Sequence, residues 1–223
     1  MLDAPVRRAL EPTLDAAAAG LARLGFRATT LTVAGWVVGV AACVLVATSH
    51  WHLALVAWLL NRVLDGLDGP LARRTGSTDL GGFLDIVADF SIYGGFVVAA
   101  AFAEPDARVA LIVLLGTYYL SGTAFLALSS VLERRGEASR ADRDQLADGR
   151  SLLFVGGIAE GTETVVVYAL ICLMPQHLAV IAWLFAAAVA ITALQRIALG
   201  IHLLRGAEHP PSTTSSSPTE EHR

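Results

Sequence analysis

The chain has 223 residues, of which 55% are hydrophobic and 16% are charged, and its mean hydropathy is +0.59. Soluble domains carry roughly 25% charged residues, so this composition indicates a membrane-embedded protein without a large extramembrane domain. A formal net charge of −4 argues against a general nucleic-acid-binding protein. All 16 basic residues are arginine, which excludes a mechanism that needs a catalytic lysine. The two cysteines, Cys43 and Cys172, stand alone in separate apolar stretches, where ordinary packing is expected.

The order of apolar and polar segments predicts an all-α integral membrane protein with six transmembrane helices. Residues 4–25 alternate apolar and charged positions, which predicts an amphipathic N-terminal helix on the membrane surface. The expected spans follow in chain order at about 29–49, 51–74, 79–103, 107–132, 151–174 and 177–204. These segments form one membrane domain over residues 1–205. Residues 206–223 are rich in Ser, Thr, Pro and Glu and are expected to be a disordered tail.

The arginines are distributed unevenly between the two ends of these spans. With six spans, the side that carries both termini holds thirteen arginines, and the other side holds only Arg108. The thirteen are Arg7, Arg8, Arg23, Arg27, Arg73, Arg74, Arg134, Arg135, Arg140, Arg143, Arg150, Arg205 and Arg223. By the positive-inside rule, we expect both termini and the polar loop 133–150 to be cytoplasmic. We expect the membrane to be the inner membrane of a bacterial-type cell.

The second and third expected spans carry acidic residues. Asp65 and Asp68 are spaced i, i+3 and Asp85 and Asp89 are spaced i, i+4, so each pair lies on one face of its helix. The short link at 75–78 turns the chain back, which brings the two pairs together near the cytoplasmic end. Four carboxylates within a membrane domain are costly, so we expect a functional site here. Oxygen ligands without His or Cys favour Mg²⁺, Mn²⁺ or Ca²⁺.

Glycines and an arginine accompany these acids. Glycines at 66, 69, 81 and 82 would let a ligand approach the backbone closely, and Arg73 is a planar donor suited to phosphate. Carboxylates, a divalent cation and an arginine together indicate phosphoryl-group chemistry. An intramembrane Mg-dependent prenyltransferase and a cation-coupled transporter are the alternatives. The clustering of the acids toward one end of the helices favours catalysis over a transport path.

Eight residues of the acidic region stand at fixed spacings. They are Asp65, Asp68, Gly69, Ala72, Arg73, Gly81, Asp85 and Asp89. This pattern resembles the signature of the CDP-alcohol phosphotransferases, and the resemblance covers residues 1 to about 205. It implies a membrane enzyme of phospholipid biosynthesis that moves a phosphatidyl group from a CDP-linked lipid, such as CDP-diacylglycerol, to an alcohol hydroxyl with release of CMP.

The resemblance also implies roles for these residues. Asp65, Asp68, Asp85 and Asp89 would bind two divalent cations, Mg²⁺ or Mn²⁺, and Asp89 would also act as the general base, assisted by Asp85 and Arg73. The nucleotide and phosphates would be held by Asp65, Asp68, Gly69, Ala72, Arg73, Gly81 and Thr32. The partners implied are the CDP-linked lipid, a small alcohol acceptor, membrane lipid and a second copy of the chain in a homodimer.

The sequence departs from the family pattern in two places. Many members begin the first span with Pro-Asn followed by Leu-Thr, whereas residues 28–32 read Ala-Thr-Thr-Leu-Thr, which keeps the hydroxyl of Thr32 but lacks the asparagine. Phe90 follows the final aspartate, where members that use glycerol phosphate or inositol phosphate tend to have Lys or Arg. The resemblance therefore implies an uncharged or zwitterionic alcohol acceptor, unless Arg134 or Arg135 supplies the charge.

Four charged residues outside the motif also fall within expected spans. Glu160, Glu163, Arg62 and Arg196 reach similar depths, roughly 14 to 18 Å from the cytoplasmic end at 1.5 Å per residue. Because an unpaired ion is costly there, we expect a polar network of the two glutamates with Arg196, Arg62 or both. Such a network would either lock the helices together or shape the acceptor pocket.

Overall fold

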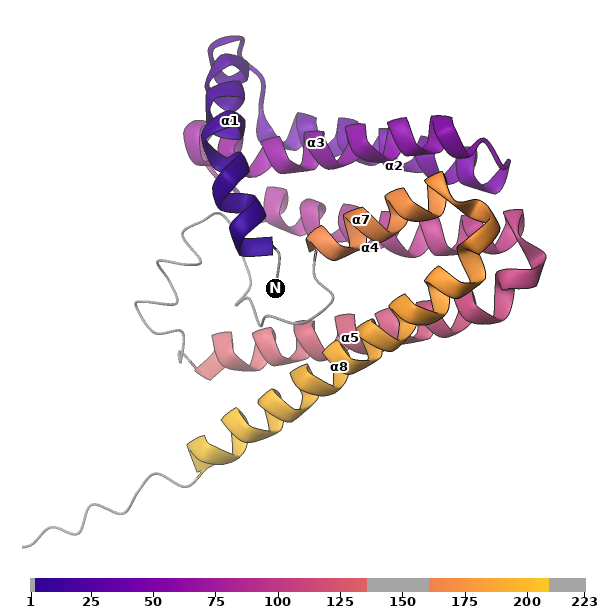
Figure 1. Ribbon diagram of the computed structural model, residues 1–223. Coiled ribbons are helices and arrows are strands. Elements are labelled where there is room, and N and C mark those ends of the chain that lie inside the picture. The colour runs from indigo at the N-terminus through magenta and orange to yellow at the C-terminus, as the bar shows by residue number, and fades with distance from the viewer. Residues whose placement is uncertain (1–2, 136–160, 209–223) are drawn as a thin grey trace, which may run out of the picture.

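The computed structural model describes residues 3–135 and 161–208, and the regular elements in these ranges are α-helices and two short 3-10 turns (Figure 1). In chain order they are α1 Asp3–Arg23, α2 Ala28–Ala47, α3 Trp51–Thr75, α4 Asp79–Ala103, η1 Pro105–Ala107, α5 Arg108–Arg135, α7 Gly161–Leu173, η2 Pro175–His177 and α8 Leu178–Glu208. The described residues contain no strand, so the all-α prediction is confirmed for them.

Four helical segments are long and apolar enough to cross a membrane, which makes the chain an integral membrane protein. They are Ala28–Ala47, Asp79–Ala103, Pro105–Leu132 and Pro175–Arg205. Helix α3 has 25 residues, the same length as α4, but its charged side chains lower its apolarity. Helix α7 has 13 described residues, and the first ten residues of the fifth expected span lie outside the described ranges. The count of six spans therefore stays a prediction.

The C-terminal boundary of the membrane domain stays a prediction. Helix α8 continues to Glu208, so it includes the first three residues of the expected tail. Residues 209–223 lie outside the described ranges, and their expected disorder stays a prediction.

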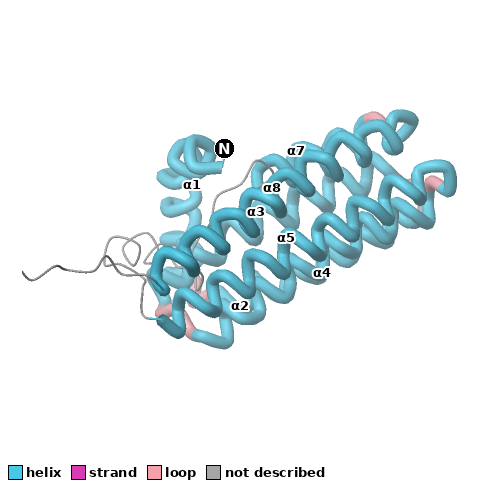
Figure 2. Tube along the Cα trace, turned by 90° about the horizontal axis from the view of Figure 1, so that it is seen from below, coloured by secondary structure: helices cyan, strands magenta, loops and turns pink. Residues whose placement is uncertain are grey.

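The long helices run back and forth along one direction, and α1 lies across one end of the bundle (Figures 1 and 2). Helix α2 packs against both α3 and α4, α7 packs against α3, and α5 pairs with α8. The main core fills the half of the bundle that carries the α2–α3, α4–α5 and α7–α8 connections. Its largest fully buried side chains include Trp58, Phe96, Leu111 and Tyr168. Asp65, Asp68 and Asp85 lie toward the opposite end of the bundle, and Asp89 lies at the edge of this core, beside Ile92.

The packing of α2 against its neighbours depends on small residues. A Cβ atom at Gly39 would stand 2.8 Å from Cγ1 of Ile92 on α4, which is closer than real Cβ contacts. One turn earlier, the amide Nδ2 of Asn61 on α3 donates to the backbone oxygen of Gly35 at 2.8 Å. Glycines at these two positions therefore let the α2 backbone approach α3 and α4 closely, as small residues do between membrane helices.

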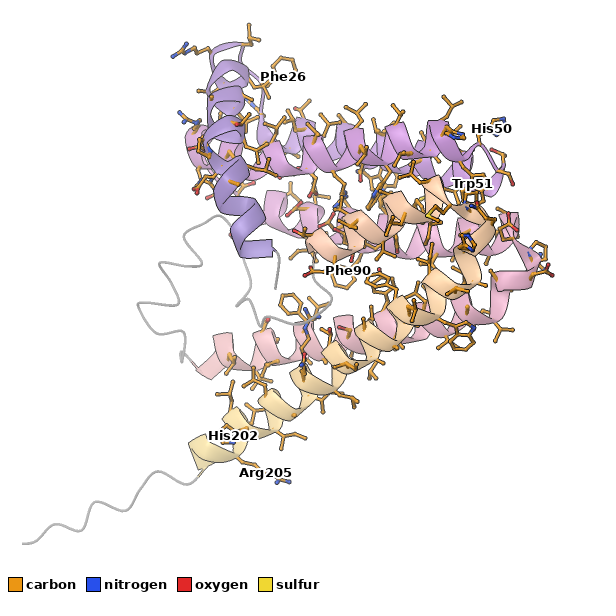
Figure 3. All side chains as sticks on the ribbon, viewed as in Figure 1. Phe26, His50, Trp51, Phe90, His202 and Arg205 are labelled. Atoms are coloured by element: carbon orange, nitrogen blue, oxygen red, sulfur yellow. The ribbon has the colours of Figure 1, made fainter. Side chains whose placement is uncertain are left out.

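Helix α1 is held to the end of the bundle by a small apolar cluster and by ion pairs. Ala18 packs with Leu31 and Leu71, all buried, and Asp15 lies 3.5 Å from Arg73 and 3.8 Å from its neighbour Arg74 at the end of α3. A helix is present where the N-terminal helix is predicted. Its amphipathic character and its place on a membrane surface stay predictions. Figure 3 marks the two ends of α2, with Phe26 before it and His50 at the turn into α3.

Candidate active site

The turn between α3 and α4 places the two aspartate pairs opposite each other. Gly76, the first residue after α3, has a φ of +100°, which glycine adopts without strain. Thr78 then caps α4, because its Oγ1 accepts a hydrogen bond from the backbone N–H of Gly81 at 3.1 Å. A glycine at 81 suits this cap, since a Cβ there would lie 3.1 Å from the same oxygen. The chain reverses over three residues, and α4 returns antiparallel to α3.

Three of the four aspartates converge on one point. Carboxylate oxygens of Asp65, Asp68 and Asp85, one from each residue, lie within 4.8 Å of one another. Oxygen atoms on opposite sides of a magnesium ion are about 4.2 Å apart, since each bond is about 2.1 Å long. Small side-chain rotations would therefore bring the three oxygens to bonding distance. The donor set contains only carboxylates, which fits a hard divalent cation such as Mg²⁺ or Mn²⁺.

The central carboxylate of this cluster is held from α2. Asp68 is buried, and the hydroxyl of Thr32 donates a hydrogen bond of 2.8 Å to its Oδ2. A buried carboxylate needs such a partner, and the bond fixes which way the other oxygen of Asp68 faces. The predicted contact of Thr32 with a nucleotide stays a prediction. What the structure adds is that the hydroxyl orients an expected metal ligand.

The fourth aspartate is not part of this cluster. Oδ1 of Asp89 instead forms an ion pair of 3.0 Å with Nη1 of Arg62, a nearly buried residue on α3. The same nitrogen lies 3.4 Å from Oδ2 of Asp65, so Arg62 stands between the cluster and Asp89. Asp89 as a metal ligand therefore stays a prediction, while its side chain lies within one helical turn of Asp85.

The contacts of Arg62 differ from the predicted network. Among the described residues they go to Asn61, Asp65, Asp89 and Tyr93, and none goes to Glu163. The prediction used depth along the helix axis, and depth says nothing about the direction in which a side chain points. Glu160 lies outside the described residues.

The second arginine of the predicted network lies on α8. Arg196 donates from Nη1 to Oγ of Ser121 on α5 at 2.9 Å, and its guanidinium lies 5.2 Å from the ring centre of Phe125. These contacts tie α8 to α5. A pairing of Arg196 with Glu163 stays a prediction.

The expected phosphate contacts lie at the end of α3. A Cβ at Gly69 would meet no heavy atom within 4 Å, so open space lies beside this backbone, as a ligand site requires. Ala72 is half-buried one turn further along, and the next residue, Arg73, is exposed and pairs with Asp15 of α1. Sequence reasoning missed Asp15, because nothing in the alternating pattern of residues 4–25 distinguishes it from the other charged positions.

A small open-sided depression, with room for about one water molecule, adjoins the acids between α2, α3 and α4. Its polar lining consists of side chains from all three helices, and its apolar wall includes Trp36. The polar residues are Thr32, Asn61, Arg62, Asp65 and Asp89. The indole N–H of Trp36 donates to Oγ of Ser91 at 2.9 Å, which joins α2 to α4 beside the depression. Acidic, amide and guanidinium groups thus surround a space next to the predicted metal ligands.

Comparisons with known proteins agree with this geometry. The family model for CDP-alcohol phosphatidyltransferase matches residues 26–194. The inner membrane protein YnjF of Escherichia coli is 36% identical over 212 residues, which cover 92% of this chain and 98% of that protein. A bifunctional IPC transferase and DIPP synthase of Thermococcus kodakarensis is 36% identical over 74 residues, or 31% of this chain and 17% of that protein.

Solved structures share the fold. The crystal structure of phosphatidylinositol phosphate synthase (PgsA1) of Mycobacterium tuberculosis with CDP-DAG bound has a TM-score of 0.65 at 23% identity, and the likeness covers 84% of this chain and 92% of that one. The structure of the same enzyme with manganese and citrate has a TM-score of 0.66 at 22% identity, over 84% of this chain and 88% of that one. The family match and the similarity to YnjF decide between the phosphotransferase and its two alternatives, because they cover most of the chain: this protein is an enzyme that belongs to the CDP-alcohol phosphatidyltransferase family.

Proposed function

We propose that this enzyme transfers a phosphatidyl group from CDP-diacylglycerol to the hydroxyl of a small alcohol and releases CMP. The observation that carries the proposal is the convergence of Asp65, Asp68 and Asp85 beside a fourth carboxylate that an arginine holds in place. That arrangement provides both a cation site for a pyrophosphate and a separate group that can accept a proton. The structural likeness to an enzyme solved with CDP-DAG supports the choice of donor.

The three clustered aspartates would hold Mg²⁺ or Mn²⁺, and we propose two ions with Asp89 at the edge of the second. Cations held there would offset the negative charge of the pyrophosphate, which would make CMP a better leaving group. Gly69 would lie against the nucleotide, because open space adjoins its backbone, and we assign neighbouring contacts to Ala72, Gly81 and Thr32. Arg73 would exchange its exposed ion pair with Asp15 for a lipid phosphate, which a planar guanidinium binds well.

Asp89 would act as the general base. The acceptor hydroxyl gives its proton to the carboxylate of Asp89 while its oxygen forms a bond to the phosphorus that carries the diacylglycerol. The bond from that phosphorus to the CMP oxygen breaks, and CMP leaves with the electron pair. Asp85 lies one helical turn before Asp89, so the proton acceptor would be adjacent to the cation site.

The acceptor in this proposal is uncharged or zwitterionic. Phe90, which follows the proposed base, packs against α5 so closely that a Cβ at Gly122 would lie 2.6 Å from its ring Cε1 (Figure 3). An apolar ring therefore occupies the position at which a cation would attract a phosphorylated acceptor. We further propose that Glu163 and Arg196, with Glu160, border the acceptor side of the site, because Arg196 joins α8 to α5 one residue from Gly122.

We propose six transmembrane helices with the active site and both termini on the cytoplasmic side of an inner membrane. The arginine distribution supports this orientation, since α3 ends in Arg73 and Arg74 while the opposite end of the bundle carries Arg108. Helix α1, which crosses the end of the bundle, would lie on the cytoplasmic membrane surface (Figure 1). The apolar outer faces of the helices would contact membrane lipid, and one of them a second copy of the chain.

The test is CMP release from purified protein and CDP-diacylglycerol with Mn²⁺ or Mg²⁺. Glycerol, myo-inositol and serine are compared with glycerol 3-phosphate and inositol 1-phosphate as acceptors, and mass spectrometry identifies the lipid product. EDTA should abolish CMP release, and Asp68→Asn should lower it about 100-fold because a metal ligand is lost. Asp79→Asn is the matched control, since Asp79 is an exposed acid on the same two-helix unit.

Each part of the proposal can fail separately. Metal-independent CMP release, or full activity of Asp68→Asn, would refute the metal site. Preference for a phosphorylated acceptor would refute the assignment of an uncharged or zwitterionic alcohol but not the reaction class. Absence of CMP release with all five acceptors would contradict CDP-diacylglycerol as donor.

A further inference from the structure

Arg62 is a nearly buried cation in the middle of the bundle, with 10% of its side chain exposed. Its Nε donates to Oδ1 of Asn61 at 2.8 Å. Its Nη1 lies 3.0 Å from Oδ1 of Asp89, 2.8 Å from the hydroxyl of Tyr93 and 3.4 Å from Oδ2 of Asp65. The guanidinium thus joins α3 to two residues of α4. Arg62 is not one of the eight motif residues, whose single arginine, Arg73, lies at the end of α3.

Two aromatic rings fix this guanidinium from its sides. Its central carbon lies 4.8 Å from the ring centre of Trp58 and 5.0 Å from that of Tyr93, distances at which cation–π attraction is effective. The rings are themselves held by α7. Trp58 donates from Nε1 to the backbone oxygen of Val165 at 3.2 Å, and the hydroxyl of Tyr168 donates to the backbone oxygen of Tyr93 at 2.8 Å. Rotation of the guanidinium would break several of these contacts at once.

This arrangement has a direct consequence for Asp89. In the described part of the chain, Asp89 forms its polar contact with Arg62 through Oδ1, and Oδ2 forms no hydrogen bond or ion pair. One carboxylate oxygen is therefore fixed, and the other remains available to accept a proton. Because Arg62 also lies beside Asp65, its charge offsets the repulsion between Asp89 and the three-aspartate cluster.

We propose that Arg62 is a positioning residue, which the aromatic rings of Trp58 and Tyr93 hold in place so that it orients the carboxylate of Asp89 toward the acceptor hydroxyl. The inference rests on the proposed function, in which Asp89 is the base. Arg62 acts through Asp89 and has no contact with the reacting atoms. The role requires several N–H groups in one plane, because the guanidinium donates hydrogen bonds to Asn61, Asp89 and Tyr93 at the same time. A lysine offers one compact cation and cannot reproduce this geometry.

The experiment compares Arg62→Met, Arg62→Lys and Tyr93→Phe with the wild-type enzyme. Tyr118→Phe is the matched control, because it removes a buried tyrosine hydroxyl on α5 that is not among the contacts of Arg62. Three quantities are measured: kcat and KM for CMP release from CDP-diacylglycerol with the five alcohols above, the Kd for Mn²⁺ alone from electron paramagnetic resonance, and the melting temperature.

A positioning role predicts that kcat falls while Mn²⁺ binding persists. We expect kcat to fall about 100-fold in Arg62→Met and Arg62→Lys and about tenfold in Tyr93→Phe, where one hydrogen bond to the cation is lost and the ring remains. The Kd for Mn²⁺ and the KM for CDP-diacylglycerol should change by less than about threefold, since the cluster residues are intact. Tyr118→Phe should retain wild-type kcat whatever its melting temperature.

Three results would overturn the inference. One is wild-type kcat in both Arg62 variants, and another is full rescue by lysine, which would reduce the role of Arg62 to charge alone. The third is a parallel loss of Mn²⁺ binding and kcat, which would make Arg62 a support of the metal cluster. If Arg62→Met does not fold, Tyr93→Phe decides by the same criteria. A wild-type enzyme that binds Mn²⁺ but releases no CMP would instead contradict the proposed function.

Discussion

The hydrogen bond from Thr32 to Asp68 predicts a measurable loss of metal affinity in Thr32→Val. Valine has nearly the shape of threonine, so the packing of α2 against α3 is kept while the donor to Oδ2 of Asp68 disappears. Asp68 is buried, with 8% of its surface exposed, so water cannot fully replace the lost hydroxyl. A hydrogen bond to a charged group contributes about 1.5–3 kcal/mol, which corresponds to a loss of about 10- to 150-fold in an equilibrium constant.

Loss of a partner that orients a metal ligand typically lowers metal affinity by about 10- to 100-fold, which agrees with that range. The assay is titration with Mn²⁺ followed by electron paramagnetic resonance, without CDP-linked lipid. Thr32→Ser should bind Mn²⁺ like the wild type because it keeps the hydroxyl. Thr30→Val, an exposed position on the same helix, serves as control. The reasoning is refuted if Thr32→Val binds Mn²⁺ with wild-type affinity while Asp68→Asn does not.

Two further predictions concern the packing of the bundle. Gly39→Ala should destabilise the protein by about 1–3 kcal/mol, because its Cβ would overlap the buried side chain of Ile92; melting curves should show no such loss for Gly20→Ala, where a Cβ meets nothing within 4 Å. Asp15→Asn should change stability by less than about 1 kcal/mol, because its ion pairs are 30–42% exposed. It should also speed proteolysis of α1 at low salt and have little effect at high salt, and equal effects at both would show that these charges do not hold α1.

The helical spacing of the aspartates was sufficient to predict most of the acidic site. Residues three or four apart share a helix face wherever the helix lies. Because the link between α3 and α4 is only a few residues long, α4 has to pack antiparallel to α3. The convergence of Asp65, Asp68 and Asp85 follows from those two facts. The fourth residue, Asp89, lies on the same face, but the rotamer that turns it to Arg62 depends on a cation 27 positions earlier.

The partners of Arg62 show why the rest could not be predicted with the same ease. Its spacing of three residues from Asp65 was a usable signal, whereas depth along the axis suggested a glutamate of α7 instead. The contact with Tyr93 depends on how α4 is rotated relative to α3, which long-range packing of α2 and α7 decides. The role of Thr32 was hidden for the same reason, since a hydroxyl on α2 reaches Asp68 only after the helices pack.

The polar face of α3 has a consequence for how the protein enters the bilayer. A translocon releases a segment into lipid according to its own apolarity, and each charge at the centre of a span opposes release by about 2.5–3.5 kcal/mol. Helix α3 carries Arg62, Asp65 and Asp68, and its charges find partners in Thr32 of α2 and Asp89 of α4. In the proposed topology we therefore expect α3 to be released poorly by itself. It would enter the lipid together with α2 and α4, so the acidic site would be assembled in the same event that inserts the helix.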